Sequence, residues 1–113
     1  MLENQYPFKM NTYTEQQIEK LLSVIDEYAK LIGIPIAGFR GRSQRPEFVI
    51  ARQVWWRYLN SKKLGYSYIG RLFGYNHSTI HHGVKHATEL IDAKDDYAIE
   101  CVNAIEIVKQ NPK

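Results

Sequence analysis

The stretch that decides the fold runs from Tyr66 to Ile91 and reads YSYIGRLFGYNHSTIHHGVKHATELI. Its first part has an apolar face made by Ile69, Leu72 and Phe73. Gly74 follows, and glycine tolerates the positive φ that a sharp turn needs. After it, apolar residues recur at the spacing of one helix face, at Ile80, Val84, Ala87 and Ile91. The sequence therefore predicts two helices joined by a tight turn over about residues 66–91.

The opposite face of the second predicted helix is polar and cationic. It carries His77, Ser78, His81, His82, Lys85 and Thr88. One apolar face and one small, polar face are typical of the recognition helix of a helix-turn-helix, which enters the major groove of DNA. We therefore expect a DNA-binding helix-turn-helix here, with double-stranded DNA as the partner.

Length and composition narrow the class of protein. A chain of 113 residues predicts one domain, and no apolar run has the roughly 18 residues of a membrane helix. The start of the sequence lacks an apolar signal core. The single cysteine, Cys101, lies on an apolar helix face and is expected to be buried. These features favour a cytoplasmic protein without a membrane partner.

The net charge of +3 conceals an uneven distribution. Between Gly38 and His86 there are nine basic residues and one acidic residue, Glu47. The remainder of the chain has six basic and eleven acidic residues. A basic block within an otherwise acidic chain indicates a region that faces a polyanion.

The rest of the chain is predicted to be helical, with residues 1–13 as a tail and residues 14–110 as the domain. Thr14 and Gln17 have capping-box spacing at the start of a helix that Gly33 ends. A second helix begins at Pro46, with one of Trp55 and Trp56 in the core and the other at its boundary. Asp95 is a good N-cap for the last helix. We expect an all-α fold of about five helices.

The segment from Gly33 to Arg45 is expected to be a flexible loop. Gly33 and Gly38 have the spacing of the two glycines of a phosphate loop, but Gly-Phe-Arg follows where that motif needs Gly-Lys-Ser/Thr. No nucleotide site is therefore predicted. An arm presenting Arg40, Arg42 and Arg45 fits better, since such arms reach along the DNA backbone or into the minor groove.

Four histidines within ten positions raise the question of a metal site. His77 and His81, and likewise His82 and His86, are separated by four residues and share helix faces. The zinc protease motif also needs a glutamate beside the first histidine, and Ser78 stands there instead. No glycine-framed nucleophile is visible either. We therefore predict neither an enzyme nor a cofactor, with a histidine–metal site as a lesser alternative.

The DNA interpretation assigns roles to these polar residues. Side chains at the start of the second helix would read bases, and Asn76 could pair bidentately with adenine. The predicted base contacts are Asn76, His77, Ser78 and Thr79. The predicted backbone or minor-groove contacts are Arg40, Arg42, Arg45, Lys62, Lys63, Ser67, His82, Lys85 and His86.

The same stretch resembles the C-terminal DNA-binding domain of the bacterial replication initiator DnaA, a relative of the tryptophan repressor fold. The match to the signature of that family consists of Ile69, Gly70, Phe73, Gly74, His77, Ser78, Thr79 and His82. Weaker similarity extends over about residues 20–108. The resemblance implies duplex DNA binding, with bases read from His77 and Ser78, bases or phosphate contacted by Thr79, and the minor groove entered by Arg40 or Arg42.

Three departures from the family pattern stand out. The turn is one residue shorter, Asn76 replaces an aspartate, and Glu47 follows Pro46 where a basic residue is frequent. An asparagine can donate as well as accept, so the preferred base there is expected to differ.

The family's initiator carries an ATPase module before this domain, and 113 residues leave no room for one. We therefore expect DNA binding without an ATPase of its own, in replication-origin or transcription regulation, with the replication initiator machinery as a further possible partner. The alternative is a helical adaptor that binds an acidic protein. The DNA target, a small-molecule co-repressor and the oligomeric state stay open.

Overall fold

The computed structural model describes residues 13–110, and it contains seven helices and no strand within that range. The all-α prediction is confirmed, although the helices are more numerous than the five expected. The predicted tail falls almost wholly outside the described residues. The helices are α1 (Glu15–Ser23), α2 (Ile25–Ile32), α3 (Ile36–Arg40), α4 (Pro46–Ser61), α5 (Tyr66–Phe73), α6 (His77–Asp92) and α7 (Asp96–Lys109).

The first predicted helix is divided into α1 and α2 at Val24. The capping box at its start is present, with the Gln17 amide donating to Thr14 Oγ1 at 3.1 Å and the Thr14 amide donating to Gln17 Oε1 at 2.8 Å. Val24 leaves helical geometry, with φ −89° and ψ 2°, and both Val24 and Ile25 are buried. Neighbouring residues point about 100° apart on a straight helix. The break therefore helps two consecutive side chains to enter the core.

The expected loop after Gly33 contains a short helix, α3, and is anchored to the core. Phe39 is fully buried and meets the Tyr28 ring edge-on at a centroid distance of 5.7 Å. The expectation of a flexible arm over residues 33–45 is therefore wrong. A large aromatic side chain in its middle gains more from burial than from solvent exposure.

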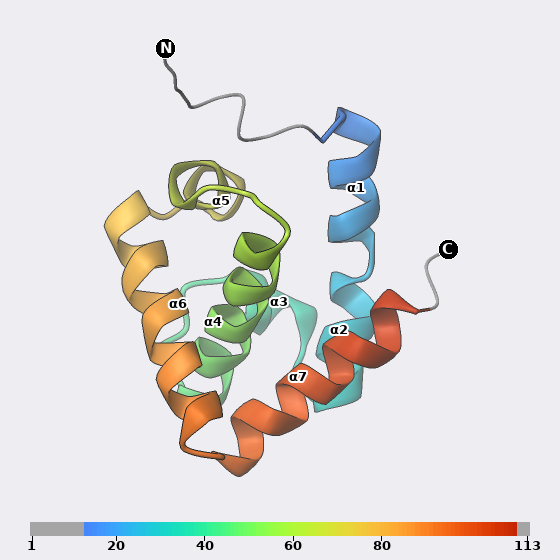
Figure 1. Ribbon diagram of the computed structural model, residues 1–113. Coiled ribbons are helices and arrows are strands. Elements are labelled where there is room, and N and C mark those ends of the chain that lie inside the picture. Colours follow the sequence, from blue (N-terminus) through green and yellow to red (C-terminus); the bar gives the residue numbers. More distant parts are fainter. Residues whose placement is uncertain (1–12, 111–113) are drawn as a thin grey trace.

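Helix α4 forms the centre of the molecule (Figure 1), with α6 on one side and α2 and α7 on the other. Trp55 lies 5.2 Å from the Tyr28 ring, and Trp56 lies 5.2 Å from the Tyr75 ring. Both tryptophans are buried, so the prediction of one core and one boundary tryptophan is wrong. Because neighbours cover α4 on both sides, residues about 100° apart around it can both be enclosed.

Helix α6 packs on α4 at unusually close range. Ile80 and Ala87 are fully buried, as the apolar stripe predicted. Between them, a Cβ added to Gly83 would lie 2.7 Å from Cε3 of Trp56. Only glycine allows the α6 backbone to approach the indole ring this closely.

Helix α7 closes the domain and begins at the predicted cap, where the Asp95 carboxylate accepts the Ala98 amide hydrogen at 2.9 Å. Cys101 on this helix is fully buried, as expected. No helix of residues 13–110 has both the length and the apolar character required to cross a bilayer.

Replacing Gly83 by valine should destabilise the fold, because its side chain would enter the space of the Trp56 ring. Overfilling a packed core costs about 1–3 kcal/mol. Urea unfolding followed by tryptophan fluorescence measures the change. Glu89→Val is the matched control, since Glu89 is exposed on the same helix and the new side chain has the same helix propensity. Equal losses in both variants would contradict the close α4–α6 contact.

Cys101 provides a test of the core on the other side of α4. Burial raises the pKa of its thiol to about 11. At pH 8 only about one thiol in a thousand is then ionised, against roughly one in four for a free cysteine. Because the thiolate is the nucleophile, labelling by a disulfide reagent should be at least ~100-fold slower in the native protein than in concentrated urea. Equal labelling rates in the native and the unfolded protein would show that Cys101 is accessible to the reagent.

Candidate nucleic-acid interface

The turn between α5 and α6 spans Gly74, Tyr75 and Asn76, and two glycines fix it. Gly74 has φ +81°, as the sequence predicted for a turn glycine. The carbonyl oxygen of Gly70 accepts the amide hydrogens of both Gly74 and Tyr75, at 2.7 Å and 2.9 Å. A Cβ on Gly70 would lie 2.3 Å from the Tyr75 carbonyl oxygen. The chain can therefore fold back this tightly only because residue 70 has no side chain.

Asn76 is the N-cap of α6, and its carboxamide oxygen is already occupied. Oδ1 accepts the Thr79 amide hydrogen at 3.0 Å and the Ser78 hydroxyl hydrogen at 2.9 Å. An amide oxygen has two lone pairs, and both are used. Bidentate pairing with adenine, expected from the sequence, needs this oxygen as an acceptor and would require it to leave the cap. As it stands, Asn76 offers only the hydrogens of Nδ2.

The outward face of α6 presents the residues predicted to contact DNA. His77, Ser78, Thr79, His82, Lys85 and His86 are all exposed. The centre of the His81 ring lies 4.8 Å from that of Tyr66 and 5.8 Å from that of His82. His86 is bound through Nδ1 to Gln53 Oε1 of α4 at 2.6 Å. No hydrogen bond or ring contact ties the exposed His77 side chain, at the start of α6, to another described residue.

The arginine segment, residues 40–45, is held beside this first turn. The Arg42 guanidinium lies 4.3 Å from the centre of the Tyr75 ring and donates a hydrogen bond to the Gly74 carbonyl oxygen. Arg40 is exposed on the same segment. Arg45 forms an ion pair with Glu47 at 2.8 Å, which partly neutralises it. The fold thus joins residues some thirty positions apart into one surface.

Arg52 is a member of the basic block that sequence reasoning did not single out. It is only 3% exposed, so its charge is unavailable to a partner. It lies four residues after Phe48 and four before Trp56, which are both buried. That helical spacing marks position 52 as inward-facing and could have identified it.

The remaining predicted contacts lie at the other end of α5. Lys62 and Lys63 form the turn after α4, and Lys62 lies 5.6 Å from the Tyr58 ring. Ser67 is exposed in the first turn of α5, whose N-cap, Gly65, supplies no side-chain bond. The contact between the tilted rings of Tyr66 and His81 connects this region to α6. These residues form a second cationic region, separated from the arginine segment by the length of α5.

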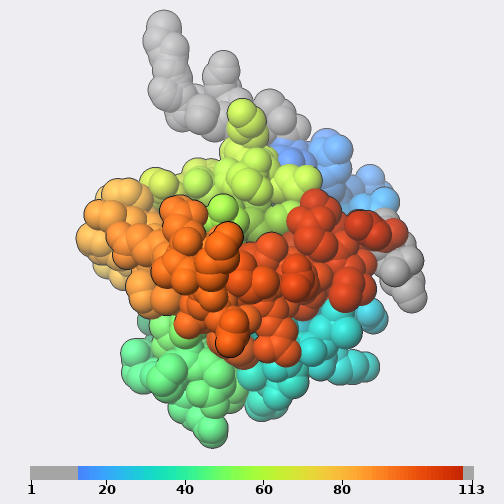
Figure 2. All heavy atoms as spheres, turned by 60° about the horizontal axis from the view of Figure 1, so that its bottom comes forward, coloured from blue at the N-terminus to red at the C-terminus, as the bar shows by residue number. Residues whose placement is uncertain are grey.

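The acidic residues lie mainly on the other helices. Seven exposed carboxylates occupy α1, α2 and α7: Glu15, Glu19, Asp26, Glu27, Asp96, Glu100 and Glu106. In Figure 1, α1 and α2 are on the side of α4 away from α5 and α6. Figure 2 shows α6 in orange beside α7 in red, with the green segment leading into α4 below it. The acidic side chains of α1 and α2 therefore lie across α4 from α5 and α6, whereas those of α7 lie on a helix beside α6.

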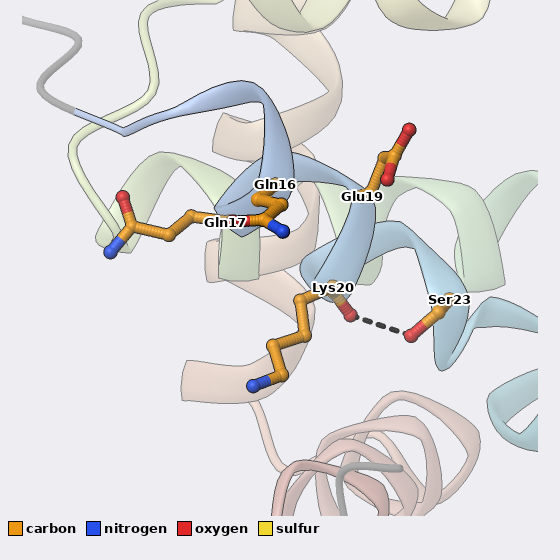
Figure 3. A pocket seen from close by; sticks show the side chains of 5 residues that line it. All are labelled: Gln16, Gln17, Glu19, Lys20 and Ser23. Carbon is orange, nitrogen blue, oxygen red and sulfur yellow. Dashed lines mark hydrogen bonds between the residues drawn. The ribbon is translucent and has the colours of Figure 1, made fainter.

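Two other kinds of site have weaker support. Within residues 13–110, no three His, Cys, Asp or Glu side chains are grouped as a metal ion would need. Figure 3 shows a surface depression on α1, lined by Gln16, Gln17, Glu19, Lys20 and Ser23. Its drawn hydrogen bond joins the Ser23 hydroxyl to the Lys20 carbonyl oxygen at 2.8 Å, and its side chains spread apart. It has no convergent set of polar groups for a small molecule.

A scan against protein-family models, a search of curated proteins and a search of solved structures each return no match. The resemblance to the DnaA C-terminal domain therefore stays a proposal that rests on the residues of the α5–α6 region.

Asn76→Ala should lower the free energy of unfolding by about 1 kcal/mol, because the first turn of α6 loses its cap. Asn76→Asp is the matched control, since a carboxylate can accept the same hydrogen bonds and favours a helix start. Urea denaturation of both variants measures the difference. An alanine variant as stable as the wild type would show that the cap is not formed.

Proposed function

We propose that the protein binds double-stranded DNA sequence-specifically through a helix-turn-helix made of α5, the Gly74–Asn76 turn and α6. The proposal keeps the resemblance to the DnaA C-terminal domain, with regulation at a replication origin or a promoter as the process. The main support is that the fold places two candidate DNA-contacting elements, the arginine segment and the start of α6, next to each other. The Arg42 guanidinium is stacked on Tyr75, directly before the exposed start of α6.

In this proposal the first turn of α6 enters the major groove. His77 and Thr79 contact base edges, while Ser78 accepts hydrogen bonds because its own hydrogen is given to Asn76. Asn76 donates from Nδ2 and so favours a base acceptor such as guanine O6 or thymine O4 over the cytosine amino group. The base contacts proposed from the sequence are kept, with a narrower role for Asn76.

Phosphate contacts would come from both ends of α5. Arg42 uses one of its donors on Gly74 and keeps four others in a rigid fork suited to phosphate. Lys62, Lys63 and Ser67 lie at the start of α5, and Lys85 on α6. Cations on two sides of the recognition helix can contact the backbone on either side of a groove, which fixes the register of the protein on DNA. The acidic helices α1 and α2, across α4 from α6, would face away from the duplex.

The first experiment is selection of bound sequences from a random duplex pool at roughly 150 mM salt, near the physiological range where electrostatic binding is already weakened. We expect one enriched motif. Its comparison with the initiator's own binding box would show whether the protein can compete at origins. Retained DNA without enrichment would indicate a non-specific binder. No retained DNA would overturn the proposal and favour an adaptor for an acidic protein.

His77→Ala should reduce discrimination between the selected site and a scrambled duplex by about 1–3 kcal/mol, because one base contact is lost. Fluorescence anisotropy with both duplexes measures the ratio of affinities. Lys20→Ala is the control, since this exposed lysine is on α1, away from α6. Discrimination that survives His77→Ala unchanged would show that the first turn of α6 does not read bases.

A further inference from the structure

Arg52, on α4, is a charged side chain buried in the core. Within residues 13–110 no acidic side chain forms an ion pair with it. Its guanidinium instead donates to three neutral acceptors: Nε to the Phe39 carbonyl oxygen at 3.0 Å, Nη2 to the Ser43 carbonyl oxygen at 2.5 Å, and Nη1 to the Tyr75 hydroxyl at 3.2 Å. Burial of a charge is costly unless its donors are satisfied, so these three bonds are needed together.

The positions of these acceptors are informative. Phe39 and Ser43 flank the short stretch that contains Arg40 and Arg42, so Arg52 ties down both of its ends. The third acceptor, Tyr75, belongs to the turn before α6 and itself donates to the Gly41 carbonyl oxygen at 3.4 Å. A single guanidinium therefore connects α4, the arginine segment and the α5–α6 turn.

An apolar side chain of similar length could fill this space without the cost of burying a charge. It could not hold three acceptors that lie on two separate parts of the chain. A lysine could not do so either, because its ammonium is a single point of donation, whereas the guanidinium is a planar fork with five donors. Of these side chains, only the guanidinium can therefore hold the three acceptors in fixed positions relative to one another.

We propose that Arg52 is a positioning residue for DNA binding, which sets the placement of Arg40 and Arg42 relative to the first turn of α6 without touching DNA. This inference rests on the proposed function. A groove-contacting arginine on a mobile loop would lose conformational entropy on binding, and a fixed one loses less. Arg52 thereby couples the arginine contacts to the register of the recognition helix.

The test compares Arg52→Lys with wild type by the dependence of DNA affinity on salt. If the arginine segment is released, its phosphate contacts weaken, and the slope of log affinity against log salt should become shallower by about 1–2. Arg57→Lys is the matched control, since Arg57 is on the same helix and bonds Thr88 Oγ1 at 3.2 Å, away from the segment. Its slope should equal that of the wild type.

A second readout separates positioning from general stability. Arg40→Ala should weaken binding by about threefold to tenfold in the wild type but by less than about twofold in Arg52→Lys, because the segment is already displaced. A folded Arg52→Lys variant that keeps both the wild-type slope and the full effect of Arg40→Ala would overturn the inference. Failure of the wild type to bind DNA would instead overturn the proposed function.

If Arg52→Lys does not fold, Tyr75→Phe provides the test. It removes the hydroxyl that joins Arg52 to Gly41 and keeps the aromatic ring beneath Arg42. In Tyr75→Phe the salt slope should become shallower and the effect of Arg40→Ala should shrink, as expected for Arg52→Lys. Both changes should be smaller than in Arg52→Lys. No change in either quantity would contradict the positioning role.

Discussion

The buried guanidinium of Arg52 is the constraint on which the candidate interface depends. Its charge is stable inside the protein only while three acceptors surround it, and two of these are the backbone carbonyls of Phe39, directly before the arginine segment, and of Ser43 within it. The third is the hydroxyl of Tyr75, in the turn before α6. The arginine segment, the turn and α4 thus share one buried charge, and losing any acceptor would leave part of it unsatisfied.

Two close backbone approaches complete this arrangement. Gly70 lets the turn fold against α5, and Gly83 lets α6 rest on the Trp56 ring. Both sites exclude a Cβ, so they fix the height of α6 above α4 and the direction in which its first turn points. The exposed side chains of α6 are thus presented by a rigid scaffold. Rigid presentation is what groove recognition requires, since contacts to base edges depend on small displacements.

The distribution of charge supports binding to DNA in general but does not account for recognition of a particular base sequence. Cations at both ends of α5 and on α6 would attract any polyanion, whereas the acidic helices α1, α2 and α7 would be repelled by it. Such asymmetry orients the protein before contact. Reading of bases would come from the few donors and acceptors at the start of α6, where the cap reduces Asn76 to a donor.

The sequence by itself determined the features whose partners lie within a few residues. The Thr14–Gln17 capping box, the Asp95 cap and the positive φ of Gly74 were all predictable, because short-range geometry dictates them. The exposed face of α6 followed from helical periodicity in the same way. Only the tertiary structure decided that the arginine segment is anchored, that both tryptophans are enclosed, and which acceptors satisfy the Arg52 guanidinium. Those outcomes depend on contacts between residues far apart in the chain, which local propensity and periodicity do not encode.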